Sequence, residues 1–357
     1  YEVMDLCLSC KGCKSECPSN VDVAKLKAEF LQHYYDANGV PIRSRLIGSY
    51  SSLSRIGSWL PKLYNYLMTG KGISRLIKKF SGFAAARSLP SLPKETLKKW
   101  FKKHQSQISG NPGKVGTVYF FCDEFTNYHD ATIGIKSVLL LERLGYEVII
   151  PDHEESGRTW LSKGLLRKAK KIANRNLKSL GPLISAERPL IGIEPSAILC
   201  FRDEYIDLAD DDLLESAKAL SKNVFSIEEF LSKEIDRGMI RKEQFSNESK
   251  KIKLHGHCQQ KALSSLSHAV KVLSLPENYV VETIPSGCCG MAGSFGYEKE
   301  HYELAMKIGE LVLFPSVRNQ PEEILIAASG TSCRHQILDG TGKKAQHPAQ
   351  ILFDALV

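Results

Sequence analysis

The stretch YVVETIPSGCCGMAGSFG, Tyr279 to Gly296, joins a β-branched run to a glycine-rich loop that carries two adjacent cysteines. YVVETIP predicts a strand, because β-branched and aromatic residues pack well on a pleated surface. Adjacent cysteines rarely bridge each other, whereas two thiolates on one tight loop suit a soft metal or an iron–sulfur cluster. We therefore expect a strand that ends in a metal-binding loop, with Cys288 and Cys289 as ligands.

Strand-like and helix-like segments alternate on both sides of this stretch. KIKLHGH (251–257) and EILIAAS (323–329) predict strands, and helices are expected from Ala262 to Leu273 and from Glu298 to Leu313. A cysteine follows each of these two strands, and parallel α/β sheets collect their ligand-binding loops at the carboxyl ends of strands. The second half of the chain therefore predicts a parallel sheet with a metal site formed by Cys258, Cys288, Cys289 and Cys333.

The preceding part of the chain shows the same alternation. TVYFF (117–121), EVIIP (147–151) and PLIGIEP (189–195) predict strands, and residues 131–145 predict a helix. Alternation of this kind is typical of a parallel sheet flanked by helices. The expected fold class is therefore α/β, with two duplicated units that each contain a parallel sheet.

Spacing supports the duplication. Gly157 precedes Cys200 by 43 residues, and Gly290 precedes Cys333 by the same number. Cys122 follows the first strand of its half, as Cys258 does in the other. The first half has otherwise lost the motif, since it reads Glu-Ser-Gly-Arg (155–158) where the second half has the adjacent cysteines. We interpret the first unit as mainly scaffold.

A second cysteine motif, CLSCKGCKSECP (Cys7 to Pro18), has the spacing C-x2-C-x2-C-x3-C-P. This is the bacterial ferredoxin pattern, in which three thiolates share one [4Fe–4S] cluster and the fourth serves a neighbouring cluster. Zinc sites usually separate their C-x2-C pairs by a longer loop. We expect Cys7, Cys10 and Cys13 to share a cluster and Cys17 to serve another. Because the sequence starts at Tyr1 without a matching run, we also expect that half of this electron-transfer domain lies upstream.

The net charge of +8 is concentrated near the N-terminus. Residues 20–115 contain seventeen Lys and Arg against four Asp and Glu, a net charge of +13, and this segment is expected to form a first helix over 21–39 and then several short ones. A basic face suits anionic lipid or an acidic partner domain, and the alternative is an ordinary solvated face. No nucleic-acid-binding motif accompanies the charge, so we expect no nucleic acid partner.

The composition favours a cytoplasmic protein. Ten cysteines grouped as metal ligands suit a reducing compartment, and neither a signal peptide nor an apolar run of membrane-spanning length is visible. The basic segment is the candidate for peripheral contact with the inner membrane face. We expect four parts: a ferredoxin-like segment (1–40), a basic helical connector (41–114), a degenerate first unit (115–215) and a second unit with the cysteine site (216–357). SGNPGKVG (109–116) has the composition of a linker.

The cysteine run and the CCG-centred repeat together resemble the iron–sulfur region of the glycolate oxidase and heterodisulfide reductase type, the cysteine-rich CCG domain. The wider motifs resemble the C-terminal part of bacterial FAD-linked oxidases, a family that includes D-2-hydroxyglutarate dehydrogenases. The resemblance covers essentially the whole chain, and it rests on DEFTNYHDA (123–131), IEPSAILCFRDEY (193–205), GHC (256–258), GCCGMAG (287–293), GTSCRHQI (330–337) and HPAQIL (347–352).

This resemblance implies an oxidoreductase in which a flavin oxidises a 2-hydroxy acid, best matched by D-2-hydroxyglutarate or D-lactate. The iron–sulfur region would carry electrons onward singly to a quinone or another electron carrier. FAD and the substrate site are expected in an upstream flavin dehydrogenase domain or subunit. The chain alone is therefore expected to be inactive.

The resemblance also implies a ligand set. The general pattern takes ligands from the first Cys, the CCG pair and a terminal C-x2-C, which here gives Cys258, Cys288, Cys289 and Cys333, with Gly330 at the remaining position. Four thiolates suffice for a cubane [4Fe–4S] cluster or for zinc, whereas a five-cysteine noncubane cluster is disfavoured. Two alternatives stay open: a zinc-stabilised structural or interaction domain, and a catalytic site of the disulfide-reductase type. Alternative nitrogen ligands are His255, His257, His335 and His347.

Overall fold

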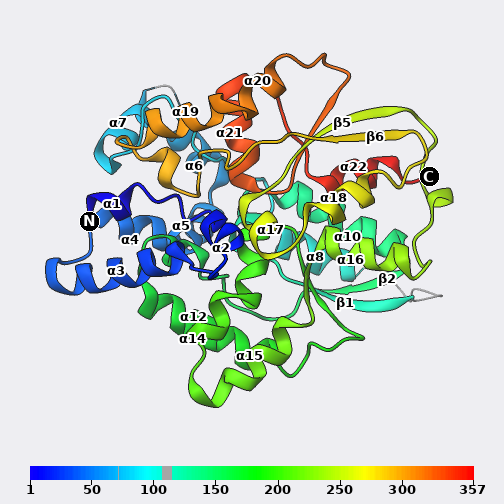
Figure 1. The fold of residues 1–357 in the computed structure, drawn as a ribbon, viewed down its shortest axis with the longest axis horizontal. Helices are drawn as coiled ribbons and strands as arrows, with labels where there is room; N and C mark the ends of the chain where they lie inside the picture. Colours follow the sequence, from blue (N-terminus) through cyan, green and yellow to red (C-terminus); the bar gives the residue numbers. More distant parts are fainter. Residues whose placement is uncertain (71, 107–114) are drawn as a thin grey trace.

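The computed structural model describes residues 1–70, 72–106 and 115–357, and in these ranges two parallel sheets follow an N-terminal group of helices (Figure 1). These helices are α1 (Glu2–Asp5), α2 (Gly12–Glu16), α3 (Val23–Asn38), α4 (Ile42–Gly48), α5 (Tyr50–Gly57), α6 (Pro61–Thr69), α7 (Ile73–Ser81) and α8 (Leu97–Gln105). Helix α3 begins where the Asp22 carboxylate accepts the amides of Ala24 and Lys25, and it ends at Gly39. The linker predicted at 109–116 lies outside the described residues as far as position 114, and Gly116 begins the first strand.

The first sheet contains β1 (Gly116–Phe120), β2 (Tyr146–Ile149), β3 (Leu190–Gly192) and β4 (Val224–Ser226) in the order β2-β1-β3-β4, all parallel. Its helices are α9 (Glu124–Tyr128), α10 (Ala131–Arg143), α11 (Arg158–Ser162), α12 (Leu166–Leu180), α13 (Pro195–Ile198), α14 (Glu204–Leu208), α15 (Leu214–Ser221) and α16 (Ile227–Asp236). The predicted strands of this half are confirmed, and β4 is an addition at the edge.

The second sheet contains β5 (Lys250–His255), β6 (Tyr279–Thr283) and β7 (Leu325–Ala328) in the order β6-β5-β7, also parallel. Its helices are α17 (Cys258–Leu263), α18 (Leu266–Leu273), α19 (Tyr302–Leu311), α20 (Leu313–Arg318), α21 (Thr331–Thr341) and α22 (Pro348–Ala355). The α/β class with parallel sheets is confirmed. The helix expected from Ala262 to Leu273 is instead two helices, because the Ser265 side chain accepts the Ser267 amide and starts α18 as a new element.

The two sheets share one strand order and one register. Tyr119 of β1 pairs with Ile149 and Leu190, and Lys253 of β5 pairs with Glu282 and Ile326. Counting from these pairs, the left-handed glycines Gly157 and Gly290 coincide, each eight residues beyond the equivalent strand position. Counted in the same way, α9 begins at the position equivalent to the start of α17, and α13 at the position equivalent to the start of α21.

The register corrects one detail of the expected duplication. Glu194 caps α13 and Gly330 caps α21 at equivalent positions, so Cys333 corresponds to Ala197 and not to Cys200. The equal 43-residue spacing therefore ends on two cysteines that are not equivalent.

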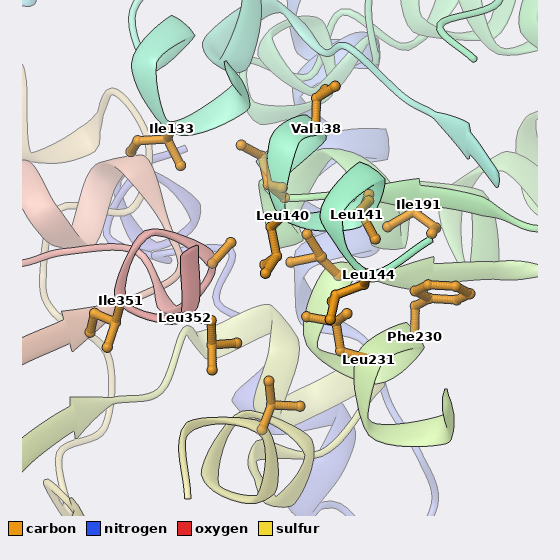
Figure 2. Packing of buried hydrophobic residues seen from close by; sticks show 14 of the residues in the cluster. Ile133, Val138, Leu140, Leu141, Leu144, Ile191, Phe230, Leu231, Ile351 and Leu352 are labelled. Atoms are coloured by element: carbon orange, nitrogen blue, oxygen red, sulfur yellow. The ribbon is translucent and has the colours of Figure 1, made fainter. Parts of the chain in front are cut away.

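A hydrophobic core lies between the sheets and joins them. Helices α10, α16, α18 and α22 occupy this space (Figure 1), and side chains from three of these helices meet there (Figure 2). Leu140 and Leu141 of α10 and Leu352 of α22 are each at most 1% exposed. Val118 of β1 and Leu254 of β5 belong to the same cluster. The two units therefore share one core.

The boundaries of the four segments drawn from the sequence stay predictions. One observation bears on them, since β4 at 224–226 lies within the range assigned to the second unit yet pairs with β3 of the first sheet. Across the ranges that the structure describes, no helix combines the length and the apolar character needed to cross a membrane.

Candidate metal centre

The four cysteines predicted for the second unit lie at the carboxyl ends of its three strands. Cys258 is the first residue of α17, directly after β5, and Cys333 lies in the first turn of α21, after β7. Cys288 and Cys289 occupy the loop after β6. This loop turns at Gly290, where φ is +92° and an added Cβ would lie 2.2 Å from the Ala305 carbonyl oxygen, so only glycine fits.

The four thiols form a chain of contacts. The thiols interact in pairs, Cys258 with Cys288, Cys288 with Cys289, and Cys289 with Cys333. These interactions lower the pKa of Cys288 and Cys333 and raise the pKa of Cys258 and Cys289. Four thiolates this close repel one another unless a cation neutralises them. The donor set therefore fits a soft metal or an iron–sulfur cluster.

His255, the last residue of β5, adds a nitrogen to this group. One ligand atom each from His255, Cys289 and Cys333 lie within 4.8 Å of one another. His255 Nδ1 lies 2.7 Å from Ser286 Oγ, whereas its buried Nε2 has no hydrogen-bond partner among the described residues. Histidine ligands commonly have their other nitrogen oriented in this way. Of the four histidines named from the sequence, His255 is the one that the structure brings to the thiols of Cys289 and Cys333.

The imidazole of His257 fills the space beside Gly330, the position of the missing fifth cysteine. A Cβ on Gly330 would lie 2.3 Å from His257 Cδ2, far closer than atoms approach. His257 is held there as the cap of α17, because its Nδ1 accepts the Gln259 amide at 3.2 Å. A side chain at position 330 would displace this ring.

The N-terminal cysteine run lies against this site. Helix α2 packs on α17 near the centre of the molecule (Figure 1). Cys10 interacts electrostatically with Cys288 more strongly than with Cys7 or Cys13, and burial raises the pKa of its thiol. Two motifs that are far apart in the sequence are therefore neighbours in the fold.

The other cysteines of the run have separate surroundings. The Ser9 amide donates to Cys7 Sγ and the Val23 amide donates to Cys13 Sγ, each at 3.4 Å. The thiol of Cys17 instead faces backbone amides of residues 19–21, which lower its pKa. Assignment of Cys7, Cys10 and Cys13 to one cluster and of Cys17 to another stays a prediction.

Lys11, inside the run, ties it to the first unit. Its side chain is 1% exposed, and its ammonium lies 2.8 Å from Asp22 and 2.6 Å from Asp203, the residue before α14. Burial alone would raise the pKa of Asp203, but hydrogen bonds from Lys11, Lys14 and Lys25 hold it well below its usual range. Sequence reasoning missed this anchor, because no local pattern connects Lys11 with a carboxylate 192 residues away.

The first unit has no thiol at the equivalent positions. By the strand register, Glu124, Glu155, Ser156 and Ala197 stand where the second unit has its four cysteines. Glu124 accepts hydrogen bonds from the hydroxyl and the amide of Ser156 at 2.7 and 2.8 Å. Burial raises the pKa of Glu124, and it raises that of Glu155 to about 7.

No family model matches the chain. Curated relatives nevertheless cover nearly all of it. D-2-hydroxyglutarate dehydrogenase of Escherichia coli K12 is 28% identical over 99% of this chain and 34% of its own length, and that of Haemophilus influenzae is 25% identical over 99% and 35%. One subunit of the anaerobic glycerol-3-phosphate dehydrogenase of Escherichia coli K12 is 22% identical over 95% of this chain and 83% of its own length. The chain is related to dehydrogenases.

The chain spans about a third of the length of the D-2-hydroxyglutarate dehydrogenases that it matches, but most of the length of the glycerol-3-phosphate dehydrogenase subunit. These relatives confirm part of the resemblance drawn from the motifs, namely that the chain is a cysteine-rich region related to dehydrogenases.

Proposed function

We propose that this chain is the iron–sulfur electron-transfer region of a flavin-dependent 2-hydroxy acid dehydrogenase, with D-2-hydroxyglutarate as the substrate of the whole protein. The observation that carries the proposal is the meeting of Cys258, Cys288, Cys289 and Cys333 in one place, with Cys10 beside them. The names of the relatives support the substrate and a partner dehydrogenase domain or subunit.

The four thiolates of the second unit are the proposed ligands of a [4Fe–4S] cluster. A cluster bound there supplies one-electron transfer. The protein contributes a buried site and a hydrogen bond from the Gly290 amide to Cys288 Sγ at 3.4 Å. Such hydrogen bonds to ligand sulfurs adjust the reduction potential.

The N-terminal run is the proposed entry point for electrons. Cys7, Cys10 and Cys13, with a fourth ligand from an upstream run, are the proposed ligands of one cluster, and Cys17 belongs to its neighbour. The electrostatic interaction between Cys10 and Cys288 supports this order, because clusters held by these two groups of thiols would lie near each other inside the protein.

We also propose that the protein works in the cytoplasm and touches the inner membrane face through α4 to α8. All ten cysteines are free thiols, as suits a reducing compartment. Between residues 37 and 94 the sequence contains ten Lys and Arg and no Asp or Glu, which favours contact with anionic lipid head groups.

A second candidate function is a zinc-stabilised interaction domain. The specific observation in its favour is the mixed donor set of His255, Cys289 and Cys333, because zinc takes both imidazole and thiolate ligands. In that case the site stabilises the fold and transfers no electrons.

Metal and sulfide analysis after anaerobic reconstitution separates the two candidates. The iron–sulfur proposal predicts about four irons with matching acid-labile sulfide at the second-unit site, and an EPR signal after reduction. The zinc proposal predicts about one zinc without sulfide. Oxidation of D-2-hydroxyglutarate by the chain alone would contradict the modular interpretation, since FAD is placed outside it.

A further inference from the structure

Lys261 of α17 connects two of the loops that carry the thiols of the second-unit site. Its ammonium donates to the carbonyl oxygens of Ser286 at 2.7 Å and Gly287 at 2.9 Å. These are the last two carbonyl groups before the adjacent cysteines, and the lysine shares its helix with Cys258. One side chain therefore joins the GHC segment (256–258) and its helix to the loop of the adjacent cysteines.

The sequence provides the space for this side chain at Gly256. A Cβ on Gly256 would lie 3.3 Å from Lys261 Cδ and 2.9 Å from Leu266 Cδ2, so a larger residue would push against the lysine stem and a neighbouring leucine. The stem is partly buried there, and packing of its methylene groups restricts the directions in which the ammonium can point. These contacts hold the ammonium at the two carbonyl groups of the loop.

Lys261 has no carboxylate partner in the part of the chain that the structure describes. Other lysines of the second unit differ, since Lys253 of β5 pairs with Glu282 and Lys271 of α18 pairs with Asp236. Carbonyl groups accept hydrogen bonds from an ammonium but do not cancel its charge. A partly buried charge without a counter-charge is costly, so an anionic group bound beside this loop would stabilise it.

We propose that Lys261 positions the loop of Cys288 and Cys289 and raises the reduction potential of the group that these cysteines bind. The inference rests on the proposed iron–sulfur function and deepens it. A [4Fe–4S] cluster held by four thiolates is negatively charged, and each electron that it takes up adds another negative charge. The ammonium of Lys261 attracts the reduced form more strongly than the oxidised form and so favours reduction. The electron comes from the flavin of the whole protein, and no bond in the chain forms or breaks.

The midpoint potential of the second-unit site, followed by EPR in the reconstituted chain, tests the role of the charge. The signal that Cys289→Ser lacks identifies this site. We expect Lys261→Met to disfavour reduction about tenfold, a fall in the midpoint potential of about 59 mV for one electron. Lys261→Arg keeps the charge and should retain the native potential. Lys271→Met is the matched control, because it removes a lysine of the same unit that pairs with Asp236, and it should leave the potential unchanged.

Hydrogen exchange in the metal-free chain tests the positioning role separately. The backbone amides of residues 286–290 should exchange about fivefold faster in Lys261→Met, the effect of one lost hydrogen bond, because the carbonyl groups of Ser286 and Gly287 lose their shared partner. Lys261→Arg should restore slow exchange, since a guanidinium can also donate to two carbonyl groups. Equal exchange in Lys261→Met and the native chain would overturn the positioning role.

The two measurements separate this inference from the function on which it rests. Iron-loaded protein with the same potential in the native chain and Lys261→Met, or with an equal fall in Lys271→Met, overturns the electrostatic role and leaves the iron–sulfur proposal intact. Loss of the cluster from Lys261→Met but not from Lys261→Arg supports the role of the charge, and loss from both overturns it. A native chain that never holds iron overturns the iron–sulfur proposal and the electrostatic role together, whereas faster exchange in Lys261→Met would still support the positioning role.

Discussion

Cys289 lies in the middle of the thiol chain and contacts both Cys288 and Cys333. Replacement by serine exchanges a soft ligand for a harder one of similar volume, so we expect Cys289→Ser to lose most of the metal while the fold remains. Metal analysis beside far-UV circular dichroism measures both. Cys122→Ser is the control, because Cys122 is equally buried but lies in the first unit. Full metal occupancy in Cys289→Ser would show that the loop holds no metal.

His255 separates the two candidate metals, because its Nε2 is buried beside Cys289 and Cys333 without a partner in the described part of the chain. The zinc proposal gives it a place as a nitrogen ligand, whereas four thiolates already fill the irons of a [4Fe–4S] cluster. If zinc is the metal, His255→Ala should lower the zinc content, and if the site holds a cluster, the iron content of the reconstituted variant should equal that of the native protein. His268→Ala, on α18, should leave the content of either metal unchanged. Native zinc content in His255→Ala would exclude the imidazole from the zinc ligand set.

Among single residues, the cysteines of the candidate site could be predicted from the sequence, but the residues that surround and orient them could not. Each cysteine follows a strand that has a local signature, so Cys258, Cys288, Cys289 and Cys333 were found by position alone. Lys11 and Asp203 were missed, because a buried ion pair between distant segments leaves no mark on local periodicity. The free nitrogen of His255 depends on Ser286 and was equally invisible.

The segment that carries the N-terminal cysteines is anchored by the buried Lys11. Lys11→Met leaves Asp22 and Asp203, which are 8% and 5% exposed, with fewer cations, and removal of one partner from a buried ion pair typically costs about 3–5 kcal/mol. Lys14 and Lys25 still neutralise Asp203, so we expect the free energy of unfolding to fall by an amount near the lower end of this range. Urea unfolding and limited proteolysis of the N-terminal segment provide the measurement.

The exposed Lys62 on α6 supplies a control for this substitution. Lys62→Met should leave the stability and the proteolysis pattern unchanged, since the side chain lies at the surface. If Lys11→Met and Lys62→Met show the same unfolding free energy and the same proteolysis pattern, the ion pairs of Lys11 do not stabilise the N-terminal segment.

The basic face of α7 should bind anionic vesicles. Each basic side chain near such a surface contributes about 1 kcal/mol, so Arg75→Glu together with Lys79→Glu should weaken binding at least tenfold. Co-sedimentation with phosphatidylglycerol vesicles measures this, and added salt should reduce it. Lys218→Glu with Lys222→Glu makes the same charge change near the end of α15. If both double variants lose vesicle binding equally, the binding depends on the net charge of the protein and not on the basic face of α7.

Element types were predictable because strands and long helices have strong periodic signals. The break between α17 and α18 was missed, since it depends on the cap formed by Ser265. Strand β4 was missed because its three residues lie at the edge of the sheet and run directly into α16, which begins at Ile227.

Across the whole molecule, His301 joins α1 to the second unit, and this contact should depend on pH. His301 Nε2 lies 2.9 Å from Asp5 Oδ2 and Nδ1 lies 3.6 Å from Glu298. Burial alone would lower the pKa of His301, but the hydrogen bond with Asp5 and the charge of Glu298 raise it to about 9 from 6.5. The stabilisation is therefore complete below about pH 6.5 and is lost as the pH rises through about 9.

Solvent screening limits the size of this effect, because the Asp5 side chain is 33% exposed. We expect a loss on the order of 1 kcal/mol in the free energy of unfolding, measured by urea denaturation at about pH 7 and about pH 10. His301→Gln should remove this part of the pH dependence. An unchanged pH profile in that variant would assign the effect to other groups.

The organisation into two similar units was predictable, although the equal 43-residue spacing did not mark equivalent residues. Alternating strands and helices gave two parallel units, and the common order of β2-β1-β3 and β6-β5-β7 confirms them. The match of Cys200 with Cys333 was wrong. Cys333 is the third residue of α21, whereas Cys200 lies after the end of α13, the equivalent helix, so the equal spacing along the chain does not mark equivalent positions. Packing of the two units on one core could not be read from either unit alone.

The common register of the two sheets also bears on ancestry. A duplicated gene begins as two identical halves, so the ancestor of this chain carried either two thiol sites or none. Descent has since made the halves unlike at four equivalent positions, with Glu124, Glu155, Ser156 and Ala197 in one and cysteines in the other. One half has therefore lost its thiols or the other has gained them, and reconstructed ancestral residues at these four positions would tell which event occurred.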